Sequence, residues 1–275
     1  MTPEATATFV GNATTLLRLG AFTMLTDPAF SPAGSRTYLG YGAWTRRLRN
    51  PALGYEELPV PDFVLLSHLH GDHFDRTARR AIPRDMQIVT TVQAEKRLRR
   101  KHFEAARGLP TWDAREWRRN GELLRITALP GRHGPGFVDH LLPDVMGSLI
   151  EWEVDGERLL RLYITGDTLY RPYLSEIRDR CGEIDAMLVH LGGTRLLGLL
   201  LTMDGRQGAD LTGLIRPALT LPIHYDDYKV MKSPLSDYLD ECRKRSITGV
   251  QPMGRGETVS LLPVGGRLPG AASNG

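Results

Sequence analysis

The sequence contains few cysteines and no long apolar segment. Cys181 and Cys242 are the only cysteines among 275 residues, and two scattered thiols indicate neither a disulfide framework nor a cysteine metal site. The amino-terminal residues lack a basic region followed by an apolar one, which argues against a secretory signal. The longest apolar stretch, residues 196–203, is far shorter than the about 20 residues that a membrane-spanning helix needs. We therefore expect a cytoplasmic protein without a transmembrane segment.

The chain also lacks a strong excess of charge of either sign. Its formal net charge is +3. Residues 97–101 and 115–119 are basic, but such runs usually face water, so we interpret them as solvated helix faces or loops. This balance argues against nucleic acid as a partner. The length suits one large core, and we expect a single domain over residues 1–264 with a disordered tail from 265 to 275. A homo-oligomer remains possible on these grounds.

One short segment concentrates side chains that bind metals. Four such residues fall between positions 68 and 73, directly after the apolar, strand-like residues 63–66. They are His68, His70, Asp72 and His73. In an extended segment, residues two apart share a face, and Gly71 permits a sharp turn that returns the later two toward the same space. Imidazole and carboxylate together suit zinc, manganese or iron. The alternative, a solvated polar turn, explains this concentration poorly.

Three later residues that can bind metals each follow a strand-like run. His133, Asp167 and His224 each follow a strand-like apolar run, and α/β folds collect ligands where strands end in loops. Taken alone, a histidine after a strand is more often a satisfied polar residue, and an aspartate after glycine is usually a turn former. Their repetition downstream of the first motif favours a shared metal site.

The periodicity predicts strands that alternate with helices. Strands are expected at 8–10, 14–19, 22–26, 87–91, 121–129, 148–154, 158–164, 184–190, 218–223 and 258–262. Helices are expected at 75–81, 93–101, 173–180, 206–215 and 235–245. Residues 31–61 form a long Gly- and Pro-containing segment that carries Tyr38, Tyr41 and Trp44. Because long loops are often functional, we expect part of this segment to cover the pocket. The alternative is an aromatic cluster that only packs the loop onto the body or forms a dimer contact.

The run from His68 to His73 matches the HxHxDH motif, and the chain resembles the metallo-β-lactamase-fold superfamily of metal-dependent hydrolases. His133, Asp167 and His224 match the remaining ligands in the family's order. Residues 11–28 resemble the branch that contains ascorbate-6-phosphate lactonases and N-acylphosphatidylethanolamine phospholipase D. The resemblance covers residues 6–262. It implies an α/β (α+β) fold, namely a four-layer αβ/βα sandwich of two mixed sheets flanked by helices.

The resemblance also implies two divalent metal ions, zinc or else manganese or iron. The first ion would be held by His68, His70 and His133. The second would be held by Asp72, His73 and His224, with Asp167 bridging both. A hydroxide between the metals would be the nucleophile, and Asp72 would be essential for catalysis. Metal binding lowers the pKa of water to about 7, which makes hydroxide available at neutral pH. Many family members carry histidine where Asn12 stands, so the resemblance assigns no role to that position.

Several further residues are candidates for contacting the substrate or supporting the ligands. They are His190, His140, Asp226, Arg132 and Trp44. The simpler interpretation is a structural hydrogen bond for His190 and a polar turn for Asp226 and its neighbour Asp227, while His140 follows the loop of His133 and is a weaker candidate for lining the pocket. Two interpretations of Asp27 remain open: it supports the histidines, or it only opens an Asp-Pro turn. Arg132 or Arg195 would serve if the substrate carries phosphate.

Three functions remain in contention. The complete ligand set favours hydrolysis of a small-molecule lactone, ester or phosphodiester. The alternative is a nuclease or other nucleic-acid-processing phosphodiesterase of the same fold, which the weak net charge disfavours. A metal-binding protein without turnover would fit an incomplete ligand set better than the complete one found here.

Overall fold

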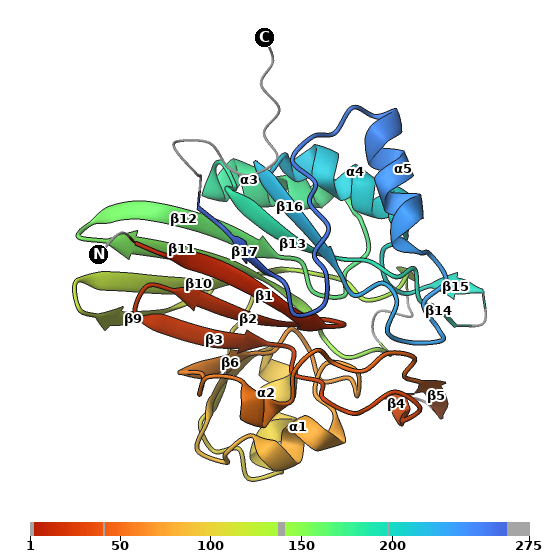
Figure 1. Cartoon of the computed structure of the whole chain (residues 1–275), viewed down its shortest axis with the longest axis horizontal. Helices are drawn as coiled ribbons and strands as arrows, with labels where there is room; N and C mark the ends of the chain where they lie inside the picture. The colour runs from red at the N-terminus through yellow and green to blue at the C-terminus, as the bar shows by residue number, and fades with distance from the viewer. Residues whose placement is uncertain (1–2, 41, 137–140, 197, 263–275) are drawn as a thin grey trace.

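Two mixed β-sheets face each other at the centre of the molecule (Figure 1). The structure is a computed structural model, and it describes residues 3–40, 42–136, 141–196 and 198–262. Within these residues the first sheet has seven strands in the order β17-β1-β2-β3-β6-β7-β8. Their bounds are β1 Ala5–Gly11, β2 Thr14–Leu19, β3 Phe22–Thr26, β6 Phe63–Leu65, β7 Gln87–Thr90, β8 Ala106–Gly108 and β17 Thr258–Ser260.

The second sheet has six strands in the described parts of the chain, in the order β16-β13-β12-β11-β10-β9. Their bounds are β9 Ala114–Arg119, β10 Glu122–Pro130, β11 Met146–Val154, β12 Glu157–Ile164, β13 Ala186–His190 and β16 Leu219–Ile223. The helices are α1 Arg76–Ala81, α2 Val92–Arg99, α3 Ser175–Cys181, α4 Gly205–Ile215 and α5 Leu235–Lys244, with 3₁₀ turns η1 Tyr55–Glu57 and η3 Pro172–Leu174.

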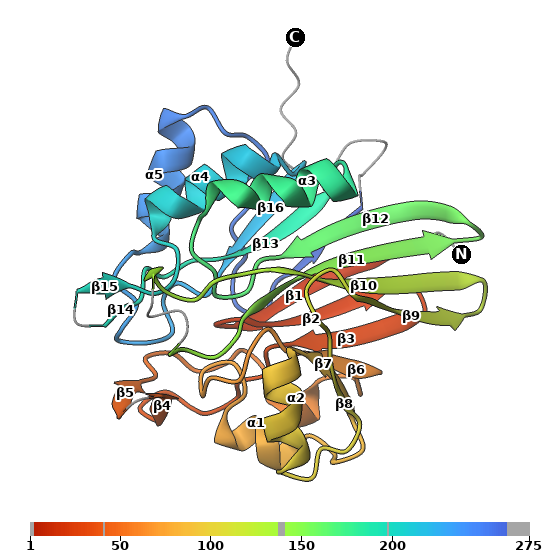
Figure 2. The ribbon, with the colours of Figure 1, turned by 180° about the vertical axis from the view of Figure 1, so that it is seen from behind.

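Helices cover the outer face of each sheet, which confirms the predicted four layers. α1 and α2 lie below the first sheet, and α3, α4 and α5 lie above the second in Figures 1 and 2. The space between the sheets is filled by alternate apolar side chains, including Leu17, Phe63, Ile150 and Leu162. Such alternation buries one face of each strand against the facing sheet and leaves the other face to the helices.

Parts of the fold differ from the sequence-based expectations. Part of the predicted loop 31–61 forms a hairpin of β4 (Arg36–Gly40) and β5 (Ala43–Arg46), in which Tyr38 is paired with Trp44. The basic run 115–119 lies in β9, at the edge of the second sheet, rather than in a helix or loop. Charged side chains are common on such edges because they prevent further strand pairing, and Trp117 anchors the strand by stacking on Phe63 at 4.6 Å between ring centroids.

Two small hairpins lie at the same end of the sandwich. One is β4–β5, and the other is formed by β14 (Arg195–Leu196) and β15 (Leu199–Leu200). Figures 1 and 2 show both beyond the end of the sheets from opposite sides. The expected tail 265–275 falls outside the described residues. No described helix is long and apolar enough to cross a membrane.

Candidate metal centre

The predicted ligands converge at this end of the sandwich. The segment from Ser67 to His73 follows β6, His133 follows β10, Asp167 follows β12 and His224 follows β16. These four strands belong to both sheets, so the site lies on the edge between them. All seven predicted ligand side chains are buried. The structure therefore brings together residues that lie up to 156 positions apart in the chain, from His68 to His224.

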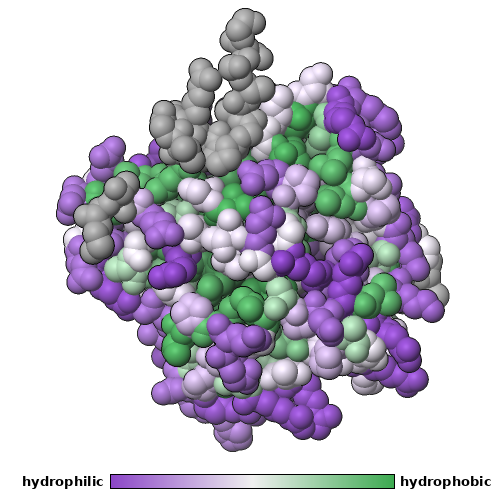
Figure 3. Space-filling model, viewed as in Figure 1, coloured by the Kyte–Doolittle hydropathy of each residue, from purple (hydrophilic) through white to green (hydrophobic). Residues whose placement is uncertain are grey.

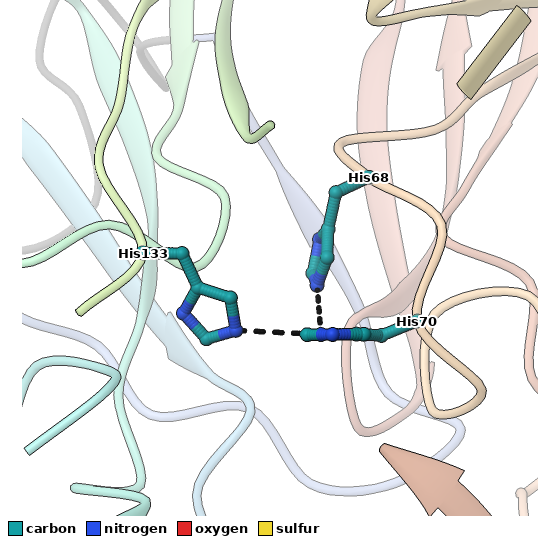
Figure 4. Close-up of side chains that lie close together, drawn as sticks. All are labelled: His68, His70 and His133. Atoms are coloured by element: carbon teal, nitrogen blue, oxygen red, sulfur yellow. Dashed lines mark hydrogen bonds between the residues drawn. The ribbon is translucent and has the colours of Figure 1, made fainter. Parts of the chain in front are cut away.

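Three imidazoles form the first group of candidate ligands (Figure 4). His68 Nε2 lies 3.0 Å from His70 Nδ1, and His133 Nε2 lies 3.3 Å from the same atom. Zinc–nitrogen bonds of about 2.0–2.1 Å in a tetrahedron place neighbouring nitrogens about 3.3 Å apart. The Nδ1 of His133 lies 2.9 Å from the carbonyl oxygen of Leu201. If Nδ1–H donates to this carbonyl, Nε2 carries the lone pair that faces the other two rings.

Two carboxylates and two imidazoles form the second group: Asp72, His73, Asp167 and His224, whose donor atoms all lie within 4.8 Å of one another. His224 Nε2 is 3.4 Å from Asp72 Oδ2, and His73 Nε2 is 3.2 Å from Asp167 Oδ2. The Oδ1 atoms of both aspartates are buried without a hydrogen-bond partner among the described residues. Buried carboxylate oxygens need a donor or a cation, so this donor set fits a divalent metal.

The two groups of candidate ligands differ in the direction in which the protein shifts the pKa values of their histidines. Burial lowers the pKa of His68, His70 and His133, that of His70 to about 3. Neutral imidazoles offer the lone pairs that a metal requires. Burial also disfavours charge at Asp72, but His73 and His224 together outweigh this effect and lower the pKa of Asp72 to about 2.

The two carboxylates of the second group are anionic and need positive charge beside them. Burial opposes charge on His73, but Asp167, Asp27 and Asp72 together raise its pKa well above the ordinary value. The same balance of burial against nearby carboxylates raises the pKa of His224. A bound cation would supply the charge that these carboxylates require.

Asp27 supports the site from behind His73. Its Oδ2 lies 3.0 Å from His73 Nδ1, and its two oxygens accept hydrogen bonds from the backbone N–H and the hydroxyl of Ser67. His190 lies on the same side, with its ring parallel to that of His73 and its Nε2 3.5 Å from Asp27 Oδ2. Such carboxylate–histidine contacts fix the ring orientation and the tautomer of a metal ligand. His190 is thus placed behind the ligands, where it contacts Thr165 and Asp27.

Asn12 links two ligands of the second group, a role that the sequence did not reveal. The side-chain Nδ2 of Asn12 donates to the backbone carbonyl of Asp72 at 2.8 Å. The backbone carbonyl of Asn12 accepts a hydrogen bond from the backbone N–H of His224 at 2.9 Å. Its backbone N–H in turn donates to Asp227 Oδ2 at 2.7 Å. Asn12, Asp27 and His224 all have positive φ angles. Non-glycine residues in this region are uncommon and concentrate at functional sites.

Two glycines allow the backbone to approach the ligands closely. A Cβ on Gly71 would lie 2.5 Å from the carbonyl oxygen of Tyr38, so the glycine is needed for contact with the β4–β5 hairpin. This differs from the predicted reason, since the φ of Gly71 is not positive. Gly166, directly before Asp167, has a φ of +62°, and a Cβ there would lie 2.8 Å from the carbonyl oxygen of Met146.

The remaining candidates lie in different surroundings. Asp226 forms ion pairs with Arg49 and Arg255 and contacts none of the predicted ligands. The side chain of Arg132 is exposed beside His133. His140 lies outside the described residues. Arg195 lines the cavity at the ligands and also pairs with Asp204 at 3.7 Å.

A small cavity of about 190 Å³ opens at the ligands. Its polar floor is formed by His70, Asp72, His133 and Asp167. Its walls come from the two hairpins and nearby loops, and include Leu39, Trp44, Leu142, Leu201 and Val230. An apolar wall around a few polar groups is typical of a small-molecule site. Trp44 is 62% exposed and packs on Tyr38 at 5.1 Å between ring centroids, so the hairpin presents an aromatic rim.

Replacing Trp44 with alanine should change KM several-fold while metal content and melting temperature stay nearly constant. The side chain is largely exposed, so its loss removes little buried area, whereas it contributes directly to the cavity wall. Steady-state kinetics and thermal unfolding of the variant measure the two effects. A lower melting temperature with unchanged kinetics per folded molecule would instead assign Trp44 to packing alone.

Comparison with known proteins agrees with this geometry. Residues 23–225 match the family model described as Beta-lactamase superfamily domain. The N-acyl-phosphatidylethanolamine-hydrolyzing phospholipase D 1 of Caenorhabditis elegans is 28% identical over 235 residues, which are 81% of this chain and 64% of that protein. The chain thus spans somewhat less than two thirds of this relative. A metal-dependent hydrolase of Anaeromyxobacter sp. (strain K) is 27% identical over 205 residues, 72% of this chain and 70% of the relative.

Solved structures show the same fold. A possible metal-dependent hydrolase from Veillonella parvula superposes with a TM-score of 0.77 at 23% identity, covering 94% of this chain and 99% of the other. An isothiocyanate hydrolase from Delia radicum gut bacteria superposes with a TM-score of 0.74 at 22% identity, covering 92% and 98%. Similarity at these identities concerns the fold, and it agrees with the two-sheet sandwich described above.

Proposed function

Because the chain belongs to the beta-lactamase superfamily, whose domain model spans most of it, we propose that it is a hydrolase that uses two divalent metal ions, most readily zinc. The observation that carries this proposal is the pair of ligand groups at the floor of one cavity. The three imidazoles would hold one ion, and Asp72, His73 and His224 the other. Asp167 belongs to the second group, and the pKa of this carboxyl group is lowered by His73 and His224 as well as by His68 of the first. This position suits a bridging ligand.

The metal ions would supply an activated water molecule and polarise the bond to be cleaved. The protein's own residues bind and orient these ions. Asp27 holds the ring of His73, and the carbonyl of Leu201 lies beside Nδ1 of His133. Asn12 holds the backbone beside Asp72 and His224. With a substrate in the cavity, its apolar walls would limit the access of bulk water, which would strengthen electrostatic interactions with the substrate.

We propose a small-molecule phosphodiester, ester or lactone as the substrate. The modest cavity volume supports a small reacting group. The name of the nematode relative describes hydrolysis of a phospholipid, which supports the phosphodiester among these classes. The names of two relatives also support metal-dependent hydrolysis in general.

Removal of metal should abolish hydrolysis, and addition of metal should restore it. Protein purified without chelator should contain up to about two equivalents of divalent metal per chain, because two complete ligand groups are present. Elemental analysis gives the stoichiometry. Assays of bis(4-nitrophenyl) phosphate, 4-nitrophenyl acetate and a γ-lactone before and after EDTA treatment, with zinc, manganese or iron added back, give the activity. EDTA-resistant turnover, or protein that stays metal-free in metal-rich medium, would contradict the proposal.

A further inference from the structure

A second, larger groove adjoins the metal centre. It lies between the β4–β5 hairpin and the helices α1 and α2, and has a volume of about 640 Å³. Five cationic side chains line it: Arg36, Arg76, Arg79, Arg97 and Lys101. In Figure 3, the lowest part of the molecule, where Figure 1 shows α1, is mostly hydrophilic. The basic run 97–101, which the sequence suggested to be a solvated face, thus contributes two cations to a concave surface.

The described residues supply no carboxylate that pairs with these cations. Arg99, on the same helix as Arg97, does pair with Glu95 at 3.3 Å. Asp75 is the acidic residue that lines the groove, and its two oxygens accept the backbone N–H groups of Ala78 and Ser31. Partial burial lowers the pKa of Lys101, and the nearby charge of Arg79 lowers it further.

Helix formation does not explain this arrangement. Cations stabilise the last turn of a helix, which accounts for Arg97 and Arg79. Arg76, however, is the first residue of α1, where a positive charge is unfavourable. Arg36 belongs to the hairpin rather than to a helix. Five like charges directed into one groove therefore oppose the folded state slightly, and an anionic ligand would relieve this opposition.

The groove leads to the metal ligands. Gly40, Trp44 and His70 line both the groove and the cavity at the metal centre. A ligand that occupies the groove therefore reaches the first imidazole group beside the aromatic rim. Together the two spaces suit one molecule of ordinary metabolite size. Arginine side chains present planar donor pairs that match phosphate oxygens.

We propose that this groove binds the phosphate group of a small-molecule substrate while the bond to be cleaved lies at the metal centre. The claim that cleavage occurs at the metal centre rests on the proposed function. The claim that the groove binds phosphate rests on the groove itself. The substrate class is then a phosphorylated small molecule that carries an ester, lactone or second phosphate ester linkage.

Binding of phenyl phosphate to the full-length chain tests the inference. Isothermal titration calorimetry is performed on the metal-loaded and the EDTA-treated protein. The variant R79Q/R97Q removes one cation from each helix wall of the groove. The matched control R80Q/R100Q removes the same charge from exposed residues at the carboxy-terminal ends of the same helices that do not line the groove. We expect the Kd to rise about tenfold in the groove variant, because charge-assisted hydrogen bonds are lost, and to change less than about twofold in the control.

Equal effects of the two variants, or no effect of either, would overturn the inference. So would a groove variant that loses binding to phosphatidylglycerol vesicles or to a single-stranded oligonucleotide but keeps its affinity for phenyl phosphate, because the groove would then serve a macromolecular partner. EDTA-sensitive hydrolysis is measured in parallel. If hydrolysis persists while phenyl phosphate binding is unaffected, the groove inference alone fails. If the groove binds as expected but no hydrolysis is detected, the proposed function alone fails.

Discussion

Replacing Asp72 with asparagine should reduce kcat more than about 100-fold while the protein remains folded. Loss of residues that merely support a metal ligand costs roughly 10–100-fold, and Asp72 is proposed to be a ligand itself. Its Oδ1 has no hydrogen-bond partner among the described residues, and its Oδ2 faces His224. Asparagine has nearly the same shape, so the backbone contact from Asn12 to residue 72 can persist.

Metal content separates this mechanism from a folding defect. Asp72→Asn should lose about one equivalent of metal and keep the ion held by the three imidazoles, which come from other positions. Asp85→Asn, at an exposed turn, is the control and should keep full activity. Circular dichroism verifies the fold of both variants. Wild-type turnover by the Asp72 variant would show that the assigned role is wrong.

The arrangement of the metal centre could be predicted because its signals are local. The motif from His68 to His73 lies within one turn after a strand, and His133, Asp167 and His224 each follow an apolar run. Strand ends meet at the edge of a sheet, so the pattern alone brings these residues near one another. The structure places their donor atoms in two compact groups. The ions themselves remain part of the proposal.

Residues that support the site through tertiary contacts were less predictable. Asn12 carries no metal-binding chemistry of its own, and its importance depends on the meeting of β1, the motif loop and β16. Asp27 precedes proline and has the sequence signature of a turn, yet it also holds His73 and Ser67. The β4–β5 hairpin is short and rich in glycine, so its period-2 pattern is too brief to distinguish it from a loop.

Arg47 lies in the segment 31–61, directly after the hairpin. Nothing in the sequence indicated a structural role for it, although its side chain is completely buried. It forms an ion pair with Asp227 at 3.2 Å and donates to the carbonyls of Ala29 and Ser31. Arg255 donates to both oxygens of Asp227, at 3.2 and 2.6 Å. Asp227 therefore joins Arg47, directly after the hairpin, to Arg255 and to Asn12.

Replacing Asp227 with asparagine should lower the free energy of unfolding by about 3–5 kcal/mol, the usual cost of leaving a buried charge without its partner. Both Arg47 and Asp227 have side chains with 0% exposure, so water cannot replace the lost carboxylate. The matched control is the neighbouring Asp226→Asn. Asp226 is partly exposed and pairs with Arg49 and Arg255, and exposed pairs contribute about 0–1 kcal/mol.

Urea denaturation of the two variants and the wild type measures this difference. Because Asp227 also accepts the backbone N–H of Asn12, we expect the Asp227 variant to hold the second metal less tightly at temperatures where it is still folded. Asp226→Asn should leave metal affinity unchanged, since its side chain contacts none of the ligands. Equal stability of the two variants would show that the buried ion pair contributes no more than a surface pair, and that the hairpin is held over the metal centre by other contacts.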